Sequence, residues 1–394
     1  MNDAYDLPLD PSDRTPWTVD LGGIHVVFGE GTLERLGAET AALGIRRALL
    51  VTDAGLEKAG HADRAIESLR RAGVAVRVYD GVEENPTTEH VGRGVAEAHA
   101  HGADGLIGLG GGSSMDCAKA VNFLFTNGRS MADYQGVDKA TRPMLPSLGV
   151  PTTTGTGSEA QRFALISDPA THRKMACGDR KARFRTVVLD PELVSTMPRR
   201  VAATTAIDAV SHALESYVTR RRNPISQLYA REAWRLLESS FEAFLADPHD
   251  RGARGRMLLG AHLGGAAIEA SMLGAAHSCA NPLTARYGVT HGVAVGLMLP
   301  HVIRFNGAAV DELYGELAHA ARLNGGGVTH AERVSARVGE LLAVAGLPAR
   351  LRDCGVDAER LDALAAEAAE QWTARFNPRA VAAGELRQLY AAAY

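Results

Sequence analysis

Short apolar runs and longer amphipathic stretches alternate along the first half of the chain, between residues 24 and 193. The apolar runs are bounded by turn-forming residues, which is typical of buried strands. The stretches between them carry apolar residues at helical spacing, for example over 61–72 and 88–101. Strands that alternate with helices predict a parallel α/β sheet with right-handed crossovers. The predicted strands are 24–28, 48–52, 74–79, 105–109, 147–150 and 186–189.

The pattern changes after Pro198. From Arg199 to Tyr394 the strand-like runs stop, and Ala, Leu, Glu and Arg recur at helical spacing. A chain of 394 residues is long for one domain, so two domains are expected. We therefore predict an α/β domain over residues 1–198 and an all-helical domain over residues 199–394.

The composition gives no indication that the protein binds nucleic acid or associates with a membrane. Apolar residues make up 46% of the chain, and the formal net charge is −4. The sequence contains no window of about 20 apolar residues, and its beginning lacks a charged segment followed by an apolar run. We expect a cytoplasmic protein that binds neither nucleic acid nor a membrane. The cysteines form no C-x-x-C pair and are expected to be small apolar filler: Cys117, Cys177, Cys279 and Cys354.

One stretch in the middle of the chain, residues 204–217, is predicted to be a helix with two polar residues on an apolar face. Asp208 and His212 are four residues apart, so both point from the same side of that helix. Small and apolar residues surround them, and a buried carboxylate and imidazole must be paired. A local hydrogen bond between the two is the simplest interpretation, and a metal site is the alternative.

Two later histidines favour the metal. His277 and His291 lie among small residues with glycine nearby, and with Asp208 and His212 they make one carboxylate and three imidazoles. This donor set suits a divalent first-row metal. His301 follows Pro300 and is expected to begin a helix, with a supporting role at most. The histidines in polar contexts are expected at the surface: His61, His90, His172 and His249.

Two predicted strands end in residues that suit a nucleotide. Asp53 directly follows a strand, where a carboxylate accepts hydrogen bonds from ribose hydroxyls or, alternatively, caps the next helix. Further on, glycines 108, 110, 111 and 112 precede Ser113 and Ser114 at a helix start. Glycines let the backbone approach an anion closely, although a tight turn alone also explains them. The motif is not G-x-G-x-x-G, because Met115 occupies the last position.

A third loop follows the next strand. Residues 151–159 read Pro-Thr-Thr-Thr-Gly-Thr-Gly-Ser-Glu, and their hydroxyls suit phosphate or sugar, or simply solvent. Two loops of the anion-binding type at neighbouring strand ends suggest a dinucleotide.

Taken together, these motifs resemble the iron-containing (group III) alcohol dehydrogenases. The resemblance extends from about Phe28 to the C-terminal helices and is specific only as a set. The resemblance rests on seven segments: residues 110–119, 151–159 and 208–212, His277, His291-Gly292, residues 299–302 and Asn377-Pro378-Arg379.

The resemblance implies a Rossmann-like N-terminal domain and an all-helical C-terminal domain, the fold shared with dehydroquinate synthase. The positions that match the family's metal ligands are Asp208, His212, His277 and His291. The positions that match its cofactor contacts are Asp53, Gly111, Gly112, Ser113, Asp116, Thr153, Thr154 and Lys174.

The implied activity is that of a metal-dependent, NAD(P)-linked alcohol dehydrogenase or aldehyde reductase. A hydride passes between the nicotinamide and a small alcohol or carbonyl compound at the metal. NAD is expected rather than NADP, because Asp53 would repel a 2′-phosphate. Fe²⁺ is the expected metal and Zn²⁺ the alternative, since both accept these ligands. The resemblance also implies a homo-oligomer, namely a dimer.

The sequence departs from the family at one position. The family usually carries a histidine four residues after its third ligand, and this chain has Asn281, followed by Pro282. An amide does not titrate, so we predict that Asn281 orients the substrate; the alternative is a helix cap. Pro282 is expected to end or bend the helix.

Three other functions stay open from the sequence. They are a non-redox lyase of the dehydroquinate synthase type, an enzyme like maleylacetate reductase, and a binding module without turnover. The complete set of one aspartate and three histidines disfavours the second, because those reductases do not keep the full ligand set.

Overall fold

The computed structural model describes residues 16–170, 174–325 and 327–394. His172 and the first residues of the chain, on which two of the predictions bear, lie outside these ranges. The chain divides into two compact units. Unit 1 is Met1–Thr153 with Ser158–Met197, and unit 2 is Thr154–Gly157 with Pro198–Tyr394. Unit 1 is α/β and unit 2 is helical, so the predicted fold class is confirmed.

Unit 1 is built on a seven-stranded sheet in the order β1-β2-β10-β7-β5-β3-β4. Every neighbouring pair is parallel except β1 with β2. The strands are β1 (Trp17–Leu21), β2 (Ile24–Phe28), β3 (Arg47–Val51), β4 (Ala75–Tyr79), β5 (Gly105–Gly110), β7 (Ser147–Pro151) and β10 (Thr186–Leu189). The helices that cross between strands are α1 (Leu36–Ala42), α2 (Ala54–Lys58), α3 (His61–Arg71), α4 (Thr88–His101) and α5 (Gly112–Asn127).

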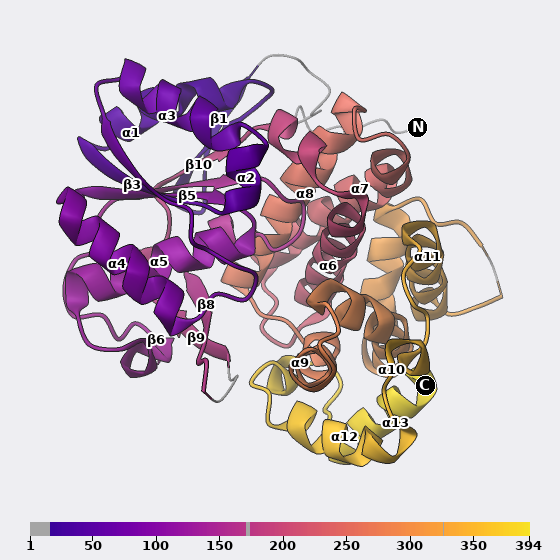
Figure 1. The fold of residues 1–394 in the computed structure, drawn as a ribbon. Helices are drawn as coiled ribbons and strands as arrows, with labels where there is room; N and C mark the ends of the chain where they lie inside the picture. Colours follow the sequence, from indigo (N-terminus) through magenta and orange to yellow (C-terminus); the bar gives the residue numbers. More distant parts are fainter. Residues whose placement is uncertain (1–15, 171–173, 326) are drawn as a thin grey trace. The chain divides into compact units, whose positions relative to one another are not determined.

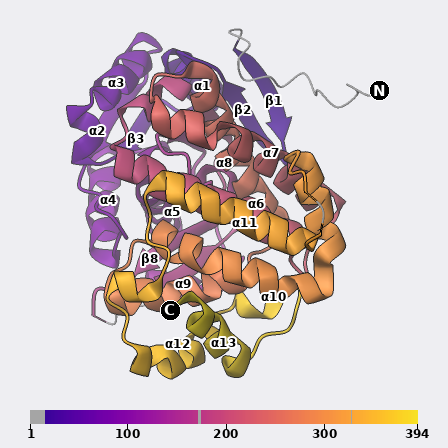
Figure 2. The ribbon, with the colours of Figure 1, turned by 90° about the vertical axis from the view of Figure 1, so that its right-hand side faces the viewer.

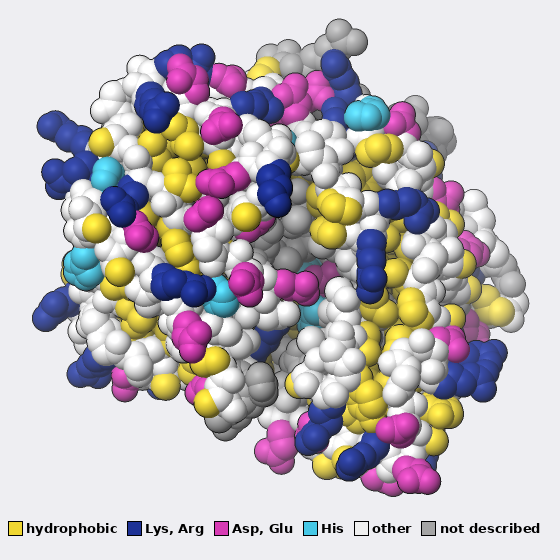
Figure 3. All heavy atoms as spheres, in the orientation of Figure 1, with side chains coloured by type: hydrophobic (Ala, Val, Ile, Leu, Met, Phe, Trp, Pro, Cys, Tyr) yellow, Lys and Arg dark blue, Asp and Glu magenta, His cyan; other side chains and the backbone are white. Residues whose placement is uncertain are grey.

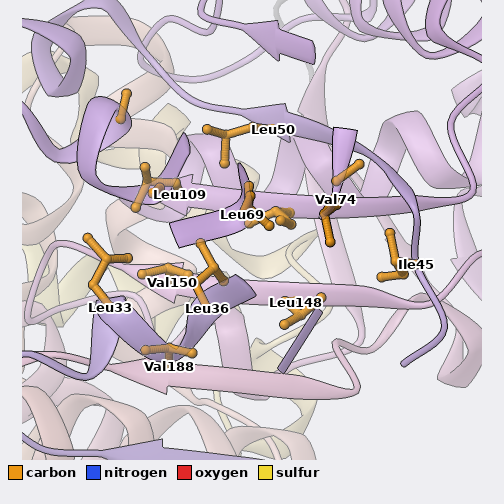
Figure 4. Packing of buried hydrophobic residues seen from close by; sticks show 14 of the residues in the cluster. Leu33, Leu36, Ile45, Leu50, Leu69, Val74, Leu109, Leu148, Val150 and Val188 are labelled. Atoms are coloured by element: carbon orange, nitrogen blue, oxygen red, sulfur yellow. The ribbon is translucent and has the colours of Figure 1, made fainter. Parts of the chain in front are cut away.

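Helices cover both faces of this sheet (Figure 1). On one face, Leu36 of α1 and Leu69 of α3 pack with Leu50, Leu109 and Val150 of the strands, all of them fully buried (Figure 4). Strands buried on both faces must be apolar along their whole length. This explains why β3, β5, β7 and β10 read as apolar runs in the sequence, apart from the first residues Arg47, Ser147 and Thr186.

Two features of unit 1 differ from the sequence prediction. Strand β1 was not predicted; it is an edge strand with three exposed central residues, so it lacks the buried run that identifies its neighbours. A separate three-stranded sheet, in the order β6-β9-β8, was also not predicted. Its strands are β6 (Gly136–Val137), β8 (Phe163–Ser167) and β9 (Lys174–Gly178), which are short and partly exposed.

Unit 2 contains no strand in its described residues. Its helices are α6 (Arg199–Val218), α7 (Pro224–Ala246), α8 (Arg251–Ala270), α9 (Ala275–Tyr287), α10 (His291–Ala320), α11 (His330–Ala345), α12 (Leu361–Ala369) and α13 (Ala383–Ala393). Helix α6 contacts α7, α8 and α10 and is buried along most of its length. Helices α10 and α11 run side by side, and α12 and α13 complete the C-terminal end (Figure 2).

Three histidine predictions are wrong. His61 is 4% exposed, and its Nε2 lies 2.8 Å from the Thr196 hydroxyl. His90 is 8% exposed, and its Nδ1 accepts the backbone N–H of Thr87 in the cap of α4. His301 does not begin a helix but lies inside α10, because the helix runs through Pro300. His249 is exposed, as predicted.

The cysteines are all free, with three buried and Cys354 partly exposed, which fits small apolar filler. On the face that Figure 3 shows, Lys and Arg side chains are interspersed with Asp and Glu. Taken singly, α10 is the one described helix that is long and apolar enough to cross a membrane, and 61% of its apolar window is buried inside the fold. Such burial is typical of a core helix.

Candidate functional site

The candidate metal ligands begin on α6. Asp208 and His212 are each 5% exposed, and the Nε2 atom of His212 lies 3.4 Å from Oδ1 of Asp208. Ala206, Ala209 and Ala213 keep the surface of this helix small, so neighbouring helices approach it closely. Asp208 and His212 are therefore polar groups at buried positions of this helix, where apolar side chains would otherwise be expected.

Helices α9 and α10 bring the other two histidines to the same oxygen. The Nε2 atoms of His277 and His291 each lie 3.8 Å from Oδ1 of Asp208. The ligating atoms of Asp208, His277 and His291 lie within 4.8 Å of one another. The rings of His212 and His277 stack, with their centroids 5.1 Å apart. Residues far apart in the sequence thus converge on one carboxylate oxygen.

Glycine explains how His291 reaches this place. A Cβ atom on Gly292 would lie 2.0 Å from the carbonyl oxygen of Thr204, and one on Gly296 would lie 2.9 Å from the Ile207 side chain. Only glycine lets the start of α10 lie so close to α6. His291 and Gly292 therefore act together: Gly292 allows α10 to approach α6 closely, and this approach positions His291.

Asp208, His277 and His291 form a group that could hold a metal ion, and His212 lies beside Asp208. At 3.4–3.8 Å the imidazole nitrogens are too far from Asp208 for a good hydrogen bond, while nitrogen and carboxylate oxygen are common ligands of such ions. The buried Nε2 of His277 has no hydrogen-bond partner among the described residues. Burial lowers the pKa of His212, and the Asp208 carboxylate only opposes that shift, so a neutral, metal-competent imidazole is favoured.

The candidate cofactor residues of unit 1 follow three adjacent strands, β3, β5 and β7. Parallel strands end at the same edge of a sheet, which is where ligands bind in such folds. Asp53 follows β3, and its carboxylate accepts the backbone N–H groups of Gly55 and Leu56 at 2.9 and 3.2 Å. The helix-cap role that the sequence left open is therefore present, and a contact with ribose stays a prediction.

Glycine is required where β5 passes into α5. Gly110 has φ +148°, and a Cβ atom there would lie 2.5 Å from the Ser114 hydroxyl. The N-cap of α5 is Gly111, which makes no side-chain hydrogen bond to the helix. Gly111, Gly112 and Ser113 are partly exposed. The first N–H groups of α5 thus start a 16-residue helix without a side-chain cap, an arrangement that favours an anion.

The Thr-rich loop after β7 is shared between the units. Thr153 belongs to unit 1, and Thr154 to Gly157 cluster with unit 2. Within unit 2, a Cβ atom on Gly155 would lie 2.6 Å from Cβ of Thr205, and one on Gly157 would lie 2.6 Å from Cα of Gly265. The glycines of this loop are therefore packing positions against α6 and α8. Thr154 is buried, and its hydroxyl has no hydrogen-bond partner among the described residues.

Two of the candidate cofactor residues lie in different surroundings. Asp116 is 8% exposed, and its carboxylate accepts hydrogen bonds from the Ser158 hydroxyl at 2.5 Å and from the backbone N–H of Leu165 at 3.1 Å. Lys119 Nζ lies 3.4 Å from the same carboxylate. Asp116 thus has a structural role inside unit 1. Lys174 is exposed at the start of β9, in the small sheet.

Asn281 does not cap a helix. Helix α9 continues through Pro282 to Tyr287, with its C-cap at Gly288, so of the predicted end or bend at the proline the end is not found. Proline removes one backbone donor, but Pro282 and Leu283 are buried in the packing of unit 2, which maintains the helix. Asn281 lies one turn beyond His277, and its Nδ2 donates to Oε1 of Gln371 at 2.9 Å.

Two polar residues that contact the candidate residues Asn281 and His277 were not predicted from the sequence. Gln371 is one of them, and no local pattern identified it because it comes from the loop after α12. Glu215 is the other: it is 4% exposed, and its Oε2 lies 2.6 Å from Nδ1 of His277. A signal for Glu215 was present, because it is a second carboxylate, seven residues after Asp208, on a helix of small and apolar residues.

Comparisons with known proteins identify the family of the chain. The family model "Iron-containing alcohol dehydrogenase" matches residues 24–191, and the model of the C-terminal part of the Fe-containing alcohol dehydrogenase family matches residues 202–394. Alcohol dehydrogenase 4 of Schizosaccharomyces pombe is 33% identical over 93% of this chain and 87% of that protein. The choline dehydrogenase of Bacillus subtilis is 35% identical over 90% of this chain and 89% of that protein.

Solved structures give the same result. The crystal structure of a 1,3-propanediol oxidoreductase matches with a TM-score of 0.91 and 31% identity, over 96% of this chain and 99% of that one. The lactaldehyde reductase of Escherichia coli, a further sequence relative, is 32% identical over 93% of this chain and 97% of that protein. The chain therefore belongs to the iron-containing alcohol dehydrogenase family, whose members are metal-dependent, nicotinamide-linked oxidoreductases that act on the CH–OH group of small alcohols and on the corresponding carbonyl compounds.

Proposed function

We propose that Asp208, His212, His277 and His291 hold one divalent metal ion, Fe²⁺ in preference to Zn²⁺, at which a small alcohol or aldehyde reacts. The observation that carries this proposal is the convergence of three imidazole Nε2 atoms on Oδ1 of Asp208, at 3.4, 3.8 and 3.8 Å. Three neutral imidazoles and one carboxylate carry a single negative charge, so a bound divalent ion stays electrophilic. Such an ion supplies a Lewis acid for the substrate oxygen.

The candidate residues that follow strands β3, β5 and β7 are proposed to bind the dinucleotide. The uncapped N–H groups of α5, behind Gly111, Gly112 and Ser113, suit an anionic pyrophosphate. Thr153 and Thr154 offer hydroxyl groups, and Asp53 an acceptor for the ribose. Asp116 and Lys174 also belong to the proposed set, Asp116 by supporting α5 through its contacts with Ser158 and Leu165. The bound nicotinamide supplies or accepts the hydride.

Asn281 is proposed to orient the substrate. Its Nδ2 is engaged by Gln371, which leaves the carbonyl oxygen of the amide as an acceptor for a substrate hydroxyl. Because neither amide titrates, these two residues position a hydroxyl and do not remove its proton. The Asn281→Ala variant is expected to keep its metal, with a raised KM, a lowered kcat/KM and a pH profile that is little changed. Loss of metal would make Asn281 a ligand, and unchanged kinetics would remove it from the site.

Alanine variants of two ligands test the metal site. His277→Ala and His291→Ala are each expected to lose metal and activity, while NADH binding, followed by fluorescence, persists. Metal content is measured by atomic spectroscopy after purification with added iron under anaerobic conditions. Full metal content in both variants would refute the proposed ligand set.

A screen of small alcohols and aldehydes with NAD(H) and NADP(H) tests the reaction class and the choice of cofactor. Net NADH production from a simple alcohol excludes the lyase alternative, because such a lyase uses NAD only transiently. NADH binding without turnover of any substrate would favour the binding module instead. Equal or higher kcat/KM with NADP(H) would contradict the preference for NAD(H).

We also propose a homodimer in the cytoplasm. Strand β1 supports the dimer: it lies at the end of the sheet and pairs only with β2 among the described strands, so its second edge can accept another strand. Light scattering on the purified protein checks this, and a monomer at all concentrations would contradict it. Fractionation of the producing cells checks the location.

A further inference from the structure

Glu215 is a buried carboxylate that faces the first turn of α9. Its Oε1 accepts the backbone N–H of Ala276 at 2.8 Å, and its Oε2 accepts the backbone N–H of His277 at 3.4 Å. The same Oε2 lies 2.6 Å from Nδ1 of the His277 ring. Among the described residues, no Lys or Arg forms an ion pair with Glu215. The side chain is 3% exposed, so the groups that stabilise its carboxylate are the N–H groups at the helix start and this one histidine.

The contact with Nδ1 decides which ring nitrogen of His277 carries the proton. A carboxylate only accepts hydrogen bonds, so Nδ1 must be the donor. The lone pair of a neutral ring is then on Nε2, and this is the nitrogen that lies 3.8 Å from Oδ1 of Asp208. The partner on one side of the ring thus prepares the nitrogen on the other side to bind a metal ion.

Glu215 also helps to determine where α9 begins. Gly274, the residue before the helix, provides no side-chain cap. Instead, Oδ1 of Asn377 accepts the N–H of Ala275 at 3.2 Å, beside the two N–H groups that Glu215 accepts. A Cβ atom on Gly274 would lie 2.9 Å from Oδ1 of Asn377 and 2.9 Å from Oε1 of Glu215. The first turn, which carries His277, is therefore fixed by acceptors from two distant segments.

The Asn377 side chain is itself held in one orientation. Its Nδ2 donates to Oδ1 of Asn306 at 2.7 Å and to the carbonyl oxygen of Arg379 at 2.7 Å, while Nδ2 of Asn306 donates back at 3.1 Å. Asn306 and Asn377 are both buried, and each is 1% exposed. This gives the Asn377-Pro378-Arg379 motif a physical role, because it presents a fixed acceptor to the start of α9.

We propose that Glu215 is a positioning residue of the metal site, which sets the Nδ1–H tautomer and the ring orientation of His277 and so tightens metal binding. The inference relies on the proposed ligand set. Asn377 supports the same helix turn from the other side. Outer-shell partners of this kind change metal affinity or activity by roughly 10- to 100-fold when they are replaced.

The Glu215→Gln variant tests the proposal. The Ala276 N–H and the His277 Nδ1–H are accepted by different oxygens of Glu215, and glutamine, which keeps the size of the side chain, replaces one of these oxygens with an NH2 donor. The measurement is the rate at which zinc-loaded enzyme loses Zn²⁺ to an excess of a chromophoric chelator. We expect E215Q to lose Zn²⁺ roughly 10- to 100-fold faster than the parent enzyme. Glu215→Asp, which keeps an acceptor-only carboxylate, is expected to lose Zn²⁺ more slowly than E215Q.

Tyr390→Phe is the matched control. The Tyr390 hydroxyl donates to the carbonyl oxygen of Cys279 at 2.7 Å, so its removal weakens the packing of α9 without affecting Glu215. This variant should have a lower melting temperature and an unchanged rate of metal loss. The proposal fails if E215Q loses Zn²⁺ as slowly as the parent, or if Y390F loses it as fast as E215Q. A His277→Ala variant that retains its metal would instead refute the ligand set itself.

Discussion

Asp116 of unit 1 and Asp208 of unit 2 are two buried carboxylates with similar sequence surroundings and different chemistry. Each lies on a long helix, and each is followed within one turn by a basic residue, Lys119 or His212. Asp116 accepts hydrogen bonds from Ser158 and Leu165 at 2.5 and 3.1 Å. The nitrogens around Oδ1 of Asp208 stand at 3.4–3.8 Å, outside the range of a good hydrogen bond.

The difference shows how to distinguish a structural carboxylate from a metal ligand. Around Asp116, a hydroxyl donor and a backbone donor lie at 2.5 and 3.1 Å, and the Lys119 ammonium group lies at 3.4 Å. Around Asp208, the neighbours are imidazoles, which change from donors to ligands when they are neutral. Both residues satisfy the rule that a buried charge has partners. The type and distance of the partners, not burial, separate the two roles.

The largest expected effect is that of Asp208→Asn. The substitution keeps the shape of the side chain and removes its charge, so the metal should be lost. We expect kcat/KM to fall by more than the roughly 100-fold that loss of an outer partner of a ligand costs. Metal content and steady-state kinetics with NAD⁺ measure this. The same substitution at Asp116 is the control: it should keep the metal, and equal metal loss in both variants would make the distinction wrong.

Lys119→Met tests the structural carboxylate. Lys119 is 1% exposed, and its ammonium group also donates to Ser158 and to the carbonyl oxygen of Phe163. Its removal leaves Asp116 charged, buried and without its cation, which costs about 3–5 kcal/mol of the free energy of unfolding. Urea denaturation measures the loss.

The double variant Asp116→Asn/Lys119→Met removes both charges and should recover part of this stability. A single Lys119→Met variant that is as stable as the parent would show that the contact contributes little. Metal content should stay unchanged in both variants, since neither residue belongs to the proposed ligand set.

Asp53→Ser separates two roles of a third carboxylate. Serine caps a helix about as well as aspartate, so α2 should keep its stability. The charge that would repel a 2′-phosphate is gone, and like charges placed together cost on the order of 1 kcal/mol or more. We expect the ratio of kcat/KM for NADP⁺ to that for NAD⁺ to rise about tenfold. An unchanged ratio would leave Asp53 with its observed role as a cap.

The smallest expected effect concerns His301, a histidine outside the proposed ligand set whose pKa is lowered. Burial, and secondarily the Arg304 charge, lower the pKa of His301 to about 4, compared with an ordinary 6.5. Below pH 6.5 the unfolded chain therefore binds a proton that the folded chain does not, and stability falls as the pH drops from about 6.5 to about 4.

The His301→Gln variant should lose less stability over this interval, by on the order of 1 kcal/mol because solvent screens a partly exposed group. Parallel urea titrations at pH 7 and pH 5 give the difference. Identical acid sensitivity in the two proteins would contradict it. The parent and the His301→Gln variant should contain equal amounts of metal at pH 7. Equal metal content would show that a histidine with a lowered pKa need not be a metal ligand.

Much of the fold was predictable because its main strands are buried on both faces. Residues 105–109 are apolar throughout and residues 186–189 are apolar after Thr186, and the structure has β5 and β10 there. Strand β1 and the small sheet were not predictable in this way, since their exposed residues give no continuous run. The change to helices after Pro198 was visible because helical spacing persists for the remaining residues.

The site was predictable only in part, because its residues act through contacts that sequence spacing does not contain. Asp208 and His212 are one helical turn apart, so their spacing in the sequence predicts that the two side chains lie together. Glu215 meets His277 across 62 positions, and Asn281 meets Gln371 across 90, so both contacts depend on tertiary packing. Helix α9 also does not end at Pro282, since burial of the helix outweighs the local cost of a proline.

The close crossing of Gly157 and Gly265 has a consequence for recombining relatives of this enzyme. Four residues, Thr154–Gly157, cluster with unit 2 although the chain on both sides of them belongs to unit 1. A chimera that joins the first 197 residues of one homologue to the remainder of another would inherit Gly157 and its α8 counterpart from different parents. Unless both parents have glycine at these two positions, a new methyl group would lie within about 2.6 Å of the opposing backbone. A hybrid that keeps each unit from a single parent therefore needs three junctions, after Thr153, after Gly157 and after Met197.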